Sequence, residues 1–190
     1  MAQLYFHYGV MNSSKSANLL MVAHNYRSQG KEVLLLTPSV DDRDGVGVIS
    51  SRVGMKEEAI IVNEGDDLFD VVFNESSHLT KCVLVDESQF LKKEQIEQLS
   101  LAVDMLDIPV MCYGLKNDFQ NNLFEGSEAL LLYADKIIEI KTICSKKECG
   151  KKAIMNLRLS DGEPIYEGQQ VQIGDEEYLP VCRYHYFKYL

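Results

Sequence analysis

Short apolar segments alternate with longer segments of helical periodicity through the first two thirds of the chain. The apolar runs have the length of buried strands and lie at residues 4–8, 32–37, 59–62, 81–86 and 109–113. Helical patterns lie at about residues 16–29, from about 66, and at 92–106 and 126–133. This alternation predicts an α/β fold with a mostly parallel sheet and helices on both of its faces. The polar stretch 38–54 predicts a long loop, which in compact domains is often functional.

Composition and charge narrow the class of protein. Of the 190 residues, 46% are hydrophobic and 25% are charged, as in globular proteins, and no apolar run reaches the ~20 residues of a membrane span. We therefore expect no membrane partner. The net charge of −10 argues against a nucleic-acid polymer as partner. Five cysteines without an export signal indicate a reducing cytoplasm.

The segment Gly9–Ser16 differs at one position from the phosphate-binding P-loop pattern G-x-x-x-x-G-K-[ST]. It lies between a predicted strand and a predicted helix, so backbone N–H groups and the helix N-terminus face one anion. We expect Lys15 to reach the terminal phosphates of ATP and the Ser16 hydroxyl to bind magnesium. The candidate ATP-binding residues here are Gly9, Val10, Met11, Asn12, Ser13, Ser14, Lys15 and Ser16.

Ser14 occupies the position of the second P-loop glycine. Glycine lets the backbone approach phosphate without an intervening Cβ, whereas serine adds a Cβ and a hydroxyl. Two outcomes are open: the side chain clashes and weakens ATP binding, or its hydroxyl donates a hydrogen bond and is tolerated.

A second nucleotide signature follows about seventy residues later, where the strand at 81–86 ends in Asp86 and Glu87. An apolar strand that ends in a carboxylate is common without any ligand. After a P-loop, however, it predicts that Asp86 helps to hold magnesium. Glu87 lies at the carboxyl edge of the sheet, where it suits a general base that accepts a proton from a hydroxyl.

The last quarter of the chain carries two closely spaced pairs, Cys144-x4-Cys149 and Cys182-x2-His185. Three thiolates and an imidazole predict a closed, structural zinc site; unrelated buried thiols and a surface histidine are the alternative. The composition changes near Lys141. We therefore expect a P-loop nucleotide-binding domain at 1–141 and a zinc-ribbon-like domain at 142–190.

With these motifs in place, the chain resembles the type II (cytosolic-type) thymidine kinases, in particular the bacterial members. The resemblance covers essentially all 190 residues and rests on motifs in the family's order. They are the opening strand, Val10-Met11-Asn12, Asp41-Asp42-Arg43, Asp86 to Phe90, Cys112 to Phe119 and Cys182 to His185. The wide Cys144–Cys149 spacing departs from the family pattern and implies a different turn.

The resemblance implies transfer of the ATP γ-phosphate to the 5′-hydroxyl of thymidine, with Glu87 as catalytic base and Arg43 neutralising the transferring phosphoryl group. It adds Asp86 and Gln89 to the ATP site and Asp41 as a contact to the sugar. The implied nucleoside-binding residues are Met11, Asp41, Phe90, Leu115, Phe119, Phe124, Val171, Ile173 and Tyr178. A lid at 171–178, carried by the zinc domain and anchored by Tyr178, would close over the base. The family also implies a homotetramer and feedback inhibition by dTTP.

Two alternatives to an active thymidine kinase stay open. One is a weak or inactive relative that binds thymidine nucleotides but is impaired at Ser14. The other is a zinc-ribbon interaction module on an α/β scaffold, which the acidic net charge and the retained carboxylates Asp86 and Glu87 disfavour.

Overall fold

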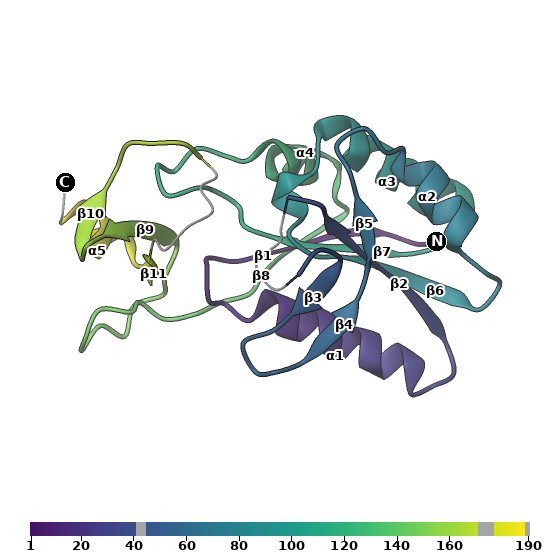
Figure 1. Ribbon diagram of the computed structural model, residues 1–190, viewed down its shortest axis with the longest axis horizontal. Helices are drawn as coiled ribbons and strands as arrows, with labels where there is room; N and C mark the ends of the chain where they lie inside the picture. The colour runs from purple at the N-terminus through teal and green to yellow at the C-terminus, as the bar shows by residue number, and fades with distance from the viewer. Residues whose placement is uncertain (41–44, 171–176, 189–190) are drawn as a thin grey trace.

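A six-stranded parallel sheet forms the centre of the computed structural model, which describes residues 1–40, 45–170 and 177–188 (Figure 1). The strands lie in the order β5-β2-β6-β7-β1-β8, and each neighbouring pair is parallel. Their bounds are β1 Leu4–Tyr8, β2 Glu32–Pro38, β5 Ile60–Val62, β6 Thr80–Val85, β7 Val110–Gly114 and β8 Lys136–Glu139. The predicted α/β class and parallel sheet are confirmed.

Helices cover both faces of this sheet, as the alternation of the sequence predicts. Helix α1 lies on one face, and α2, α3 and α4 lie on the other (Figure 1). The helical segments are α1 Lys15–Arg27, α2 Leu68–Glu75, the 3-10 turn η1 Ser88–Phe90, α3 Lys93–Leu106, α4 Glu125–Tyr133 and α5 Arg183–Phe187. No helix of the described chain is long and apolar enough to cross a membrane.

Strand β6 shows why the central strands are apolar throughout. Cys82 and Leu84 pack into the core on the α1 face, and Val83 and Val85 pack into the core on the opposite face. Successive side chains of a strand point to opposite faces, so a strand covered on both sides needs apolar residues at every position. All four side chains are fully buried.

The prediction of a continuous loop over 38–54 is wrong in part. Strand β3 (Val48–Ser50) pairs in antiparallel register with β4 (Lys56–Glu58) and forms a hairpin. Ile49 is 1% exposed and belongs to the same core cluster as Leu19 and Leu20 of α1. Strands of three residues are too short to show a periodicity, and the burial of Ile49 against α1 is a tertiary contact that the local sequence does not reveal. Strand β8 was also not predicted, since Ile137 and Ile138 are only half covered at the sheet edge.

A second, smaller sheet follows the parallel one and lies beside its end at the left of Figure 1. Strands β9 (Met155–Ser160), β10 (Glu163–Ile165) and β11 (Glu177–Val181) pair in antiparallel fashion in the order β10-β9-β11. A small core of its own includes Leu157, Val181 and Tyr186. The Tyr186 hydroxyl donates to the backbone oxygen of Phe119 at 2.7 Å, which joins the two parts. A domain boundary near Lys141 stays a prediction.

Candidate functional site

The predicted P-loop connects β1 to α1 at the carboxyl edge of the parallel sheet. Gly9 donates its N–H to the Gly114 oxygen of β7, and a Cβ on Gly9 would lie 2.3 Å from Ser13 Oγ and 2.7 Å from the Ile140 oxygen. Only glycine therefore fits at this position. Lys15 is the first residue of α1, and its Nζ donates to the Val10 oxygen at 3.0 Å. The Lys15 side chain thus lies along the loop, and its ammonium group could contact an anion bound there.

Ser14 adopts a left-handed backbone conformation with φ 63° and ψ 31° at the N-cap of α1. Its side chain is exposed and makes no capping hydrogen bond. Asn12 in the same loop also has a positive φ of 60°. The P-loop pattern has glycine at position 14, and this chain places a serine there in a conformation that favours glycine.

Asp86 follows β6 and lies next to the P-loop, as predicted. Its carboxyl group accepts a hydrogen bond from the Ser16 side chain, and its residue is 4% exposed. Burial, followed by the neighbouring charge of Glu87, raises the pKa of Asp86 to about 7, although Ser16 and Lys15 act in the opposite direction.

The surroundings of Asp86 fit a magnesium ion. Asp86 Oδ1 and Ser13 Oγ are buried without a hydrogen-bond partner in the described chain. Buried polar oxygens normally have partners, and Mg²⁺ prefers carboxylate and other oxygen ligands. Ser16 and Asp86 could therefore hold the ion together with the nucleotide phosphates.

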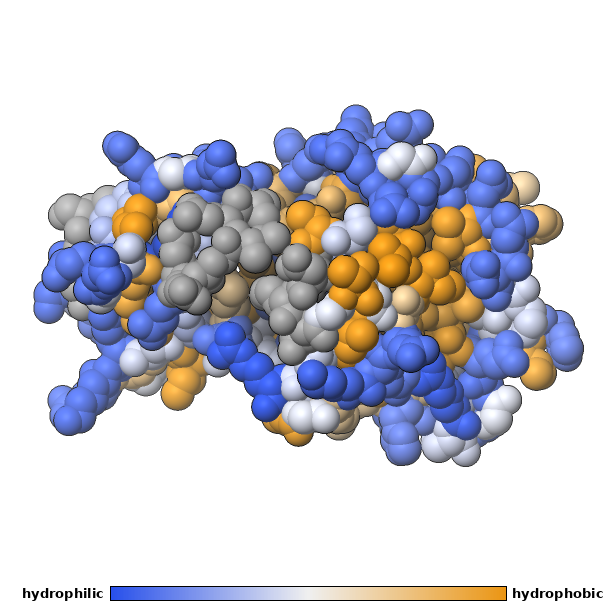
Figure 2. Space-filling view, viewed as in Figure 1, coloured by the Kyte–Doolittle hydropathy of each residue, from blue (hydrophilic) through white to orange (hydrophobic). Residues whose placement is uncertain are grey.

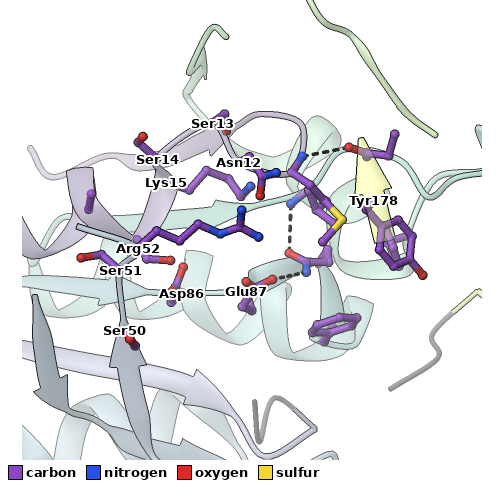
Figure 3. A pocket seen from close by; sticks show the side chains of 18 of the residues that line it. Asn12, Ser13, Ser14, Lys15, Ser50, Ser51, Arg52, Asp86, Glu87 and Tyr178 are labelled. Atoms are coloured by element: carbon purple, nitrogen blue, oxygen red, sulfur yellow. Dashed lines mark hydrogen bonds between the residues drawn. The ribbon is translucent and has the colours of Figure 1, made fainter. Parts of the chain in front are cut away.

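Glu87 also lies at this edge, in a left-handed conformation with φ 45°. Its carboxylate accepts a hydrogen bond from Gln89 Nε2 at 2.5 Å. The Gln89 Oε1 in turn accepts from the backbone N–H of Leu115 at 3.0 Å (Figure 3).

One cavity of about 860 Å³ joins these groups, a volume within the usual range of ligand pockets. Figure 3 shows P-loop residues on one side, Asp86 and Glu87 on another, and Tyr178 across from them. The predicted residues that line it are Met11, Asn12, Ser13, Ser14, Lys15, Ser16, Asp86, Glu87, Gln89, Phe90, Leu115, Phe119, Phe124 and Tyr178. Gly9 and Val10 are buried and do not line it in the described chain. Asp41, Arg43, Val171 and Ile173 lie outside the described residues.

The apolar part of the cavity is built from aromatic side chains that the sequence predicts for the base pocket. The rings of Phe90 and Phe124 meet edge to face, with centroids 5.8 Å apart and planes at 84°. Phe119 is 1% exposed, and the Arg158 guanidinium stacks over its ring at 4.7 Å. An anion site, two carboxylates and a flat apolar pocket in one cavity can bring a phosphoryl donor to a hydroxyl on an aromatic acceptor.

Among the lining residues that sequence reasoning missed, Asn156 and Arg52 matter most for the geometry of the cavity. Asn156 of β9 is 2% exposed; its Oδ1 accepts from Met11 N–H at 2.8 Å, and its Nδ2 donates to the Asn117 oxygen at 3.1 Å. Arg52 extends from the turn of the β3–β4 hairpin into the cavity (Figure 3). An asparagine within a strand carries no sequence signal. For Arg52, the only indication in the sequence was that it lies within the long polar stretch 38–54, which was expected to be functional.

The four predicted zinc ligands converge in the smaller sheet. Donor atoms of Cys144, Cys149, Cys182 and His185 all lie within 4.8 Å of one another. Cys149 Sγ is 3.9 Å from Cys182 Sγ, and His185 Nδ1 is 3.4 Å from Cys144 Sγ and 3.5 Å from Cys182 Sγ. A tetrahedral zinc with bonds of about 2.3 Å to sulfur and 2.0–2.1 Å to nitrogen requires edges of roughly 3.5–3.8 Å. The cluster thus could bind zinc, with all four positions filled by protein.

Comparisons with known proteins agree with this site. A family model described as thymidine kinase matches residues 2–186. Proteins named thymidine kinase match over nearly their whole length. The one from Lactiplantibacillus plantarum is 58% identical over 188 residues, with 98% of this chain and 96% of the relative covered. The one from Lactobacillus johnsonii is 55% identical over 195 residues (98% and 97%), and that from Streptococcus pyogenes serotype M3 is 56% identical over 188 residues (98% of each). The chain therefore belongs to the thymidine kinase family.

Proposed function

We propose that this protein transfers the γ-phosphoryl group of ATP to the 5′-hydroxyl of thymidine, with Glu87 as the general base. The single observation that carries the proposal is that the P-loop, Glu87 and the aromatic pocket line one cavity. Membership of the thymidine kinase family supports thymidine as acceptor and ATP as donor.

In the proposed reaction the donor phosphates lie against the P-loop, and Lys15 exchanges its bond to the Val10 oxygen for phosphate oxygens. Magnesium, held by Ser16 and Asp86, would neutralise charge on the phosphates. Glu87 takes the proton of the 5′-hydroxyl while that oxygen forms a bond to the γ-phosphorus. The bond from the γ-phosphorus to the bridging oxygen breaks, and ADP leaves with the electron pair. We assign Arg43 to the charge of the transferring group, and Asp41 to the sugar.

The base would lie among Met11, Phe90, Leu115, Phe119 and Phe124, which are partly or fully buried around the cavity. We propose that residues 171–178 close over it, with Tyr178, which belongs to β11, as the anchor. Gln170 supports this placement of the lid, since its amide donates to Asp118 Oδ2 at 3.0 Å. Zinc at the cysteine–histidine cluster would keep the base of the lid in place, without a part in the chemistry.

The test is formation of ADP and dTMP from ATP-Mg and thymidine by the purified protein. Glu87→Gln should lower kcat by about 10²–10⁴-fold, the usual contribution of a general base. Glu128→Gln is the matched control, because Glu128 is an exposed glutamate of α4 outside the cavity, and it should keep native kinetics. Unchanged turnover in Glu87→Gln would remove Glu87 from the role of base.

The second candidate is a weak or inactive relative that binds thymidine nucleotides, and the left-handed Ser14 is the observation that favours it. Absent turnover that Ser14→Gly restores would establish it. If neither thymidine nor dTTP raises the melting temperature, neither candidate holds.

We also propose feedback inhibition by dTTP and a homotetramer, both implied by the resemblance. dTTP would place its thymine in the base pocket and its phosphates on the P-loop, so it should compete with both substrates. An exposed apolar area supports an interface: Figure 2 shows apolar side chains gathered over the half of the molecule that holds the six-stranded sheet. Light scattering measures the assembly, and a monomer at micromolar concentration would contradict it.

A further inference from the structure

The side-chain amide of Gln89 connects Glu87 to the wall of the aromatic pocket. Its Nε2 donates to the Glu87 carboxylate at 2.5 Å, and its Oε1 accepts from Leu115 N–H at 3.0 Å. Gln89 is 2% exposed although it borders the cavity. Both polar ends of this buried side chain are therefore in use within the protein.

The protein itself determines which end of the amide faces Glu87. The backbone N–H of Leu115 can only donate, so the Gln89 atom opposite to it must be the oxygen. The amide nitrogen then points at Glu87, and a carboxylate is the acceptor that suits it. If the Gln89 amide were flipped, its NH₂ group would face the Leu115 N–H, and its oxygen would face the Glu87 carboxylate, so neither pair could form a hydrogen bond.

The turn that carries Glu87 and Gln89 is docked on the end of β7. Ser88 is fully buried, and its hydroxyl donates to the Tyr113 oxygen at 2.9 Å. A Cβ on Gly114 would lie 2.7 Å from Gln89 Oε1 and 2.8 Å from Ser88 Oγ, so the strand end leaves just enough room for these two side chains. Glu87 is held in its left-handed conformation within this docked turn.

We infer that Gln89 is a positioning residue, which fixes the Glu87 carboxylate relative to Leu115 and thus relative to an acceptor in the aromatic pocket. The inference rests on the proposed function, since it matters through Glu87 as the base. A glutamate side chain has several rotatable bonds, and a base displaced by about 1 Å can lose on the order of 10²-fold in rate. This role is distinct from the contact to ATP that the motif predicts for Gln89.

The experiment compares Gln89→Met with native protein under saturating ATP and thymidine. Methionine keeps the length of the side chain but removes both hydrogen bonds. We expect kcat to fall on the order of 10²-fold, with KM for ATP and for thymidine changed less than about threefold. Gln95→Met is the matched control: Gln95 is another buried glutamine, its amide nitrogen donates to the Asn63 and Asp66 oxygens, and it does not line the cavity in the described chain. Its kcat should stay within about threefold of native.

A second variant keeps the test decisive if Gln89→Met does not fold. Gln89→Glu retains an oxygen for Leu115 N–H and replaces the donor to Glu87 by a carboxylate. We expect it to lose at least as much kcat as Gln89→Met.

Each other outcome overturns the inference. A raised KM for ATP with native kcat would make Gln89 a nucleotide contact only. An equal loss of kcat in Gln95→Met would show that the loss of any buried glutamine lowers the rate, and that the link from Gln89 to Glu87 has no special part in it. Native kcat in both Gln89 variants would contradict the inference alone, whereas absent turnover in the native protein would overturn the proposed function together with it.

Discussion

Replacing Ser14 with glycine isolates the cost of a left-handed backbone in the phosphate-binding loop. Ser14 has φ 63° and ψ 31°, and its side chain makes no capping bond to α1. The substitution therefore removes a Cβ and a hydroxyl without removing a hydrogen bond that stabilises the helix. We expect Ser14→Gly to stabilise the folded protein.

Two opposing terms set the magnitude. A left-handed conformation costs an L-residue about 1–2 kcal/mol relative to its preferred conformations, and glycine avoids this cost. Glycine also gains about 0.4–1 kcal/mol of conformational freedom in the unfolded chain, which opposes the gain. The net expectation is about 0.5–1 kcal/mol of added stability, or a melting temperature raised by roughly 1–4 °C for a chain of this size.

Two control variants separate the backbone from the side chain. Ser14→Ala removes the hydroxyl and keeps the Cβ, so it should be no more stable than the native protein. Asn12→Gly acts on the other left-handed residue of the loop, with φ 60°. Asparagine tolerates this conformation better than other residues, so Asn12→Gly should gain less than Ser14→Gly.

The assay is urea unfolding of all four proteins in EDTA, followed by KM for ATP. If the Ser14 hydroxyl donates to a phosphate, both Ser14 variants raise KM. If its Cβ crowds the triphosphate, only the glycine variant lowers KM. A Ser14→Gly protein that is less stable than native, or an alanine variant equal in stability to the glycine variant, would refute the backbone argument.

Three further predictions address the metals, the buried acid and the cavity wall. The protein should carry about one zinc per chain by elemental analysis, and Cys149→Ser should lose it and unfold at a lower temperature; a zinc-free native protein of full stability would contradict this. The pKa of Asp86 is raised from its unfolded value of 3.8 to about 7, so the folded state holds a proton that the unfolded state has already released. In EDTA, the stabilisation from this proton should therefore be lost as the pH rises from about 4 to 7. The free energy of unfolding should fall by at most about 4 kcal/mol from this group. Calorimetry over this range should show a weaker dependence in Asp86→Asn, and an identical slope would contradict the assignment. Arg52→Ala should lower kcat/KM for ATP about three- to tenfold, a modest effect because Arg52 is exposed. The control is Lys81→Ala, at the end of β6 that is far from Asp86 and the cavity, and it should leave kcat/KM unchanged.

The central sheet could be predicted because its strands are covered on both faces. A run such as Val83-Leu84-Val85 has no polar position, and this pattern is typical of a parallel strand between two layers of helices. The β3–β4 hairpin has no such pattern. Its one fully buried side chain, Ile49, is buried in the core cluster that also holds Leu19 and Leu20 of α1, and a tertiary contact of this kind leaves no periodicity in three-residue strands.

The residues of the candidate site could be predicted where they belong to a known motif and where the parallel sheet brings two motifs to the same edge. Ser16 and Asp86 are seventy positions apart, yet they form a hydrogen bond because both follow strands that end at the same edge. The bridge through Gln89 depends on Leu115 N–H, a backbone group that no residue type identifies. Interactions between a side chain and a distant backbone group are therefore the part of this site that sequence reasoning does not reach.

The part of the chain that holds the smaller sheet is hydrogen-bonded both to the P-loop and to the segment that carries Phe119. Asn156 of β9 accepts a hydrogen bond from the backbone N–H of Met11, so this P-loop amide is bound to the half of the chain that carries the cysteine–histidine cluster. The same side chain donates to Asn117, in the segment that leads to Phe119 of the aromatic pocket, and Tyr186 of α5 donates to Phe119 itself. These three hydrogen bonds connect the half with the cysteine–histidine cluster to the P-loop and to the aromatic pocket. A zinc ion at the cysteine–histidine cluster would hold the part of the chain that carries Tyr186, and through these hydrogen bonds it would fix the P-loop and the aromatic pocket relative to each other.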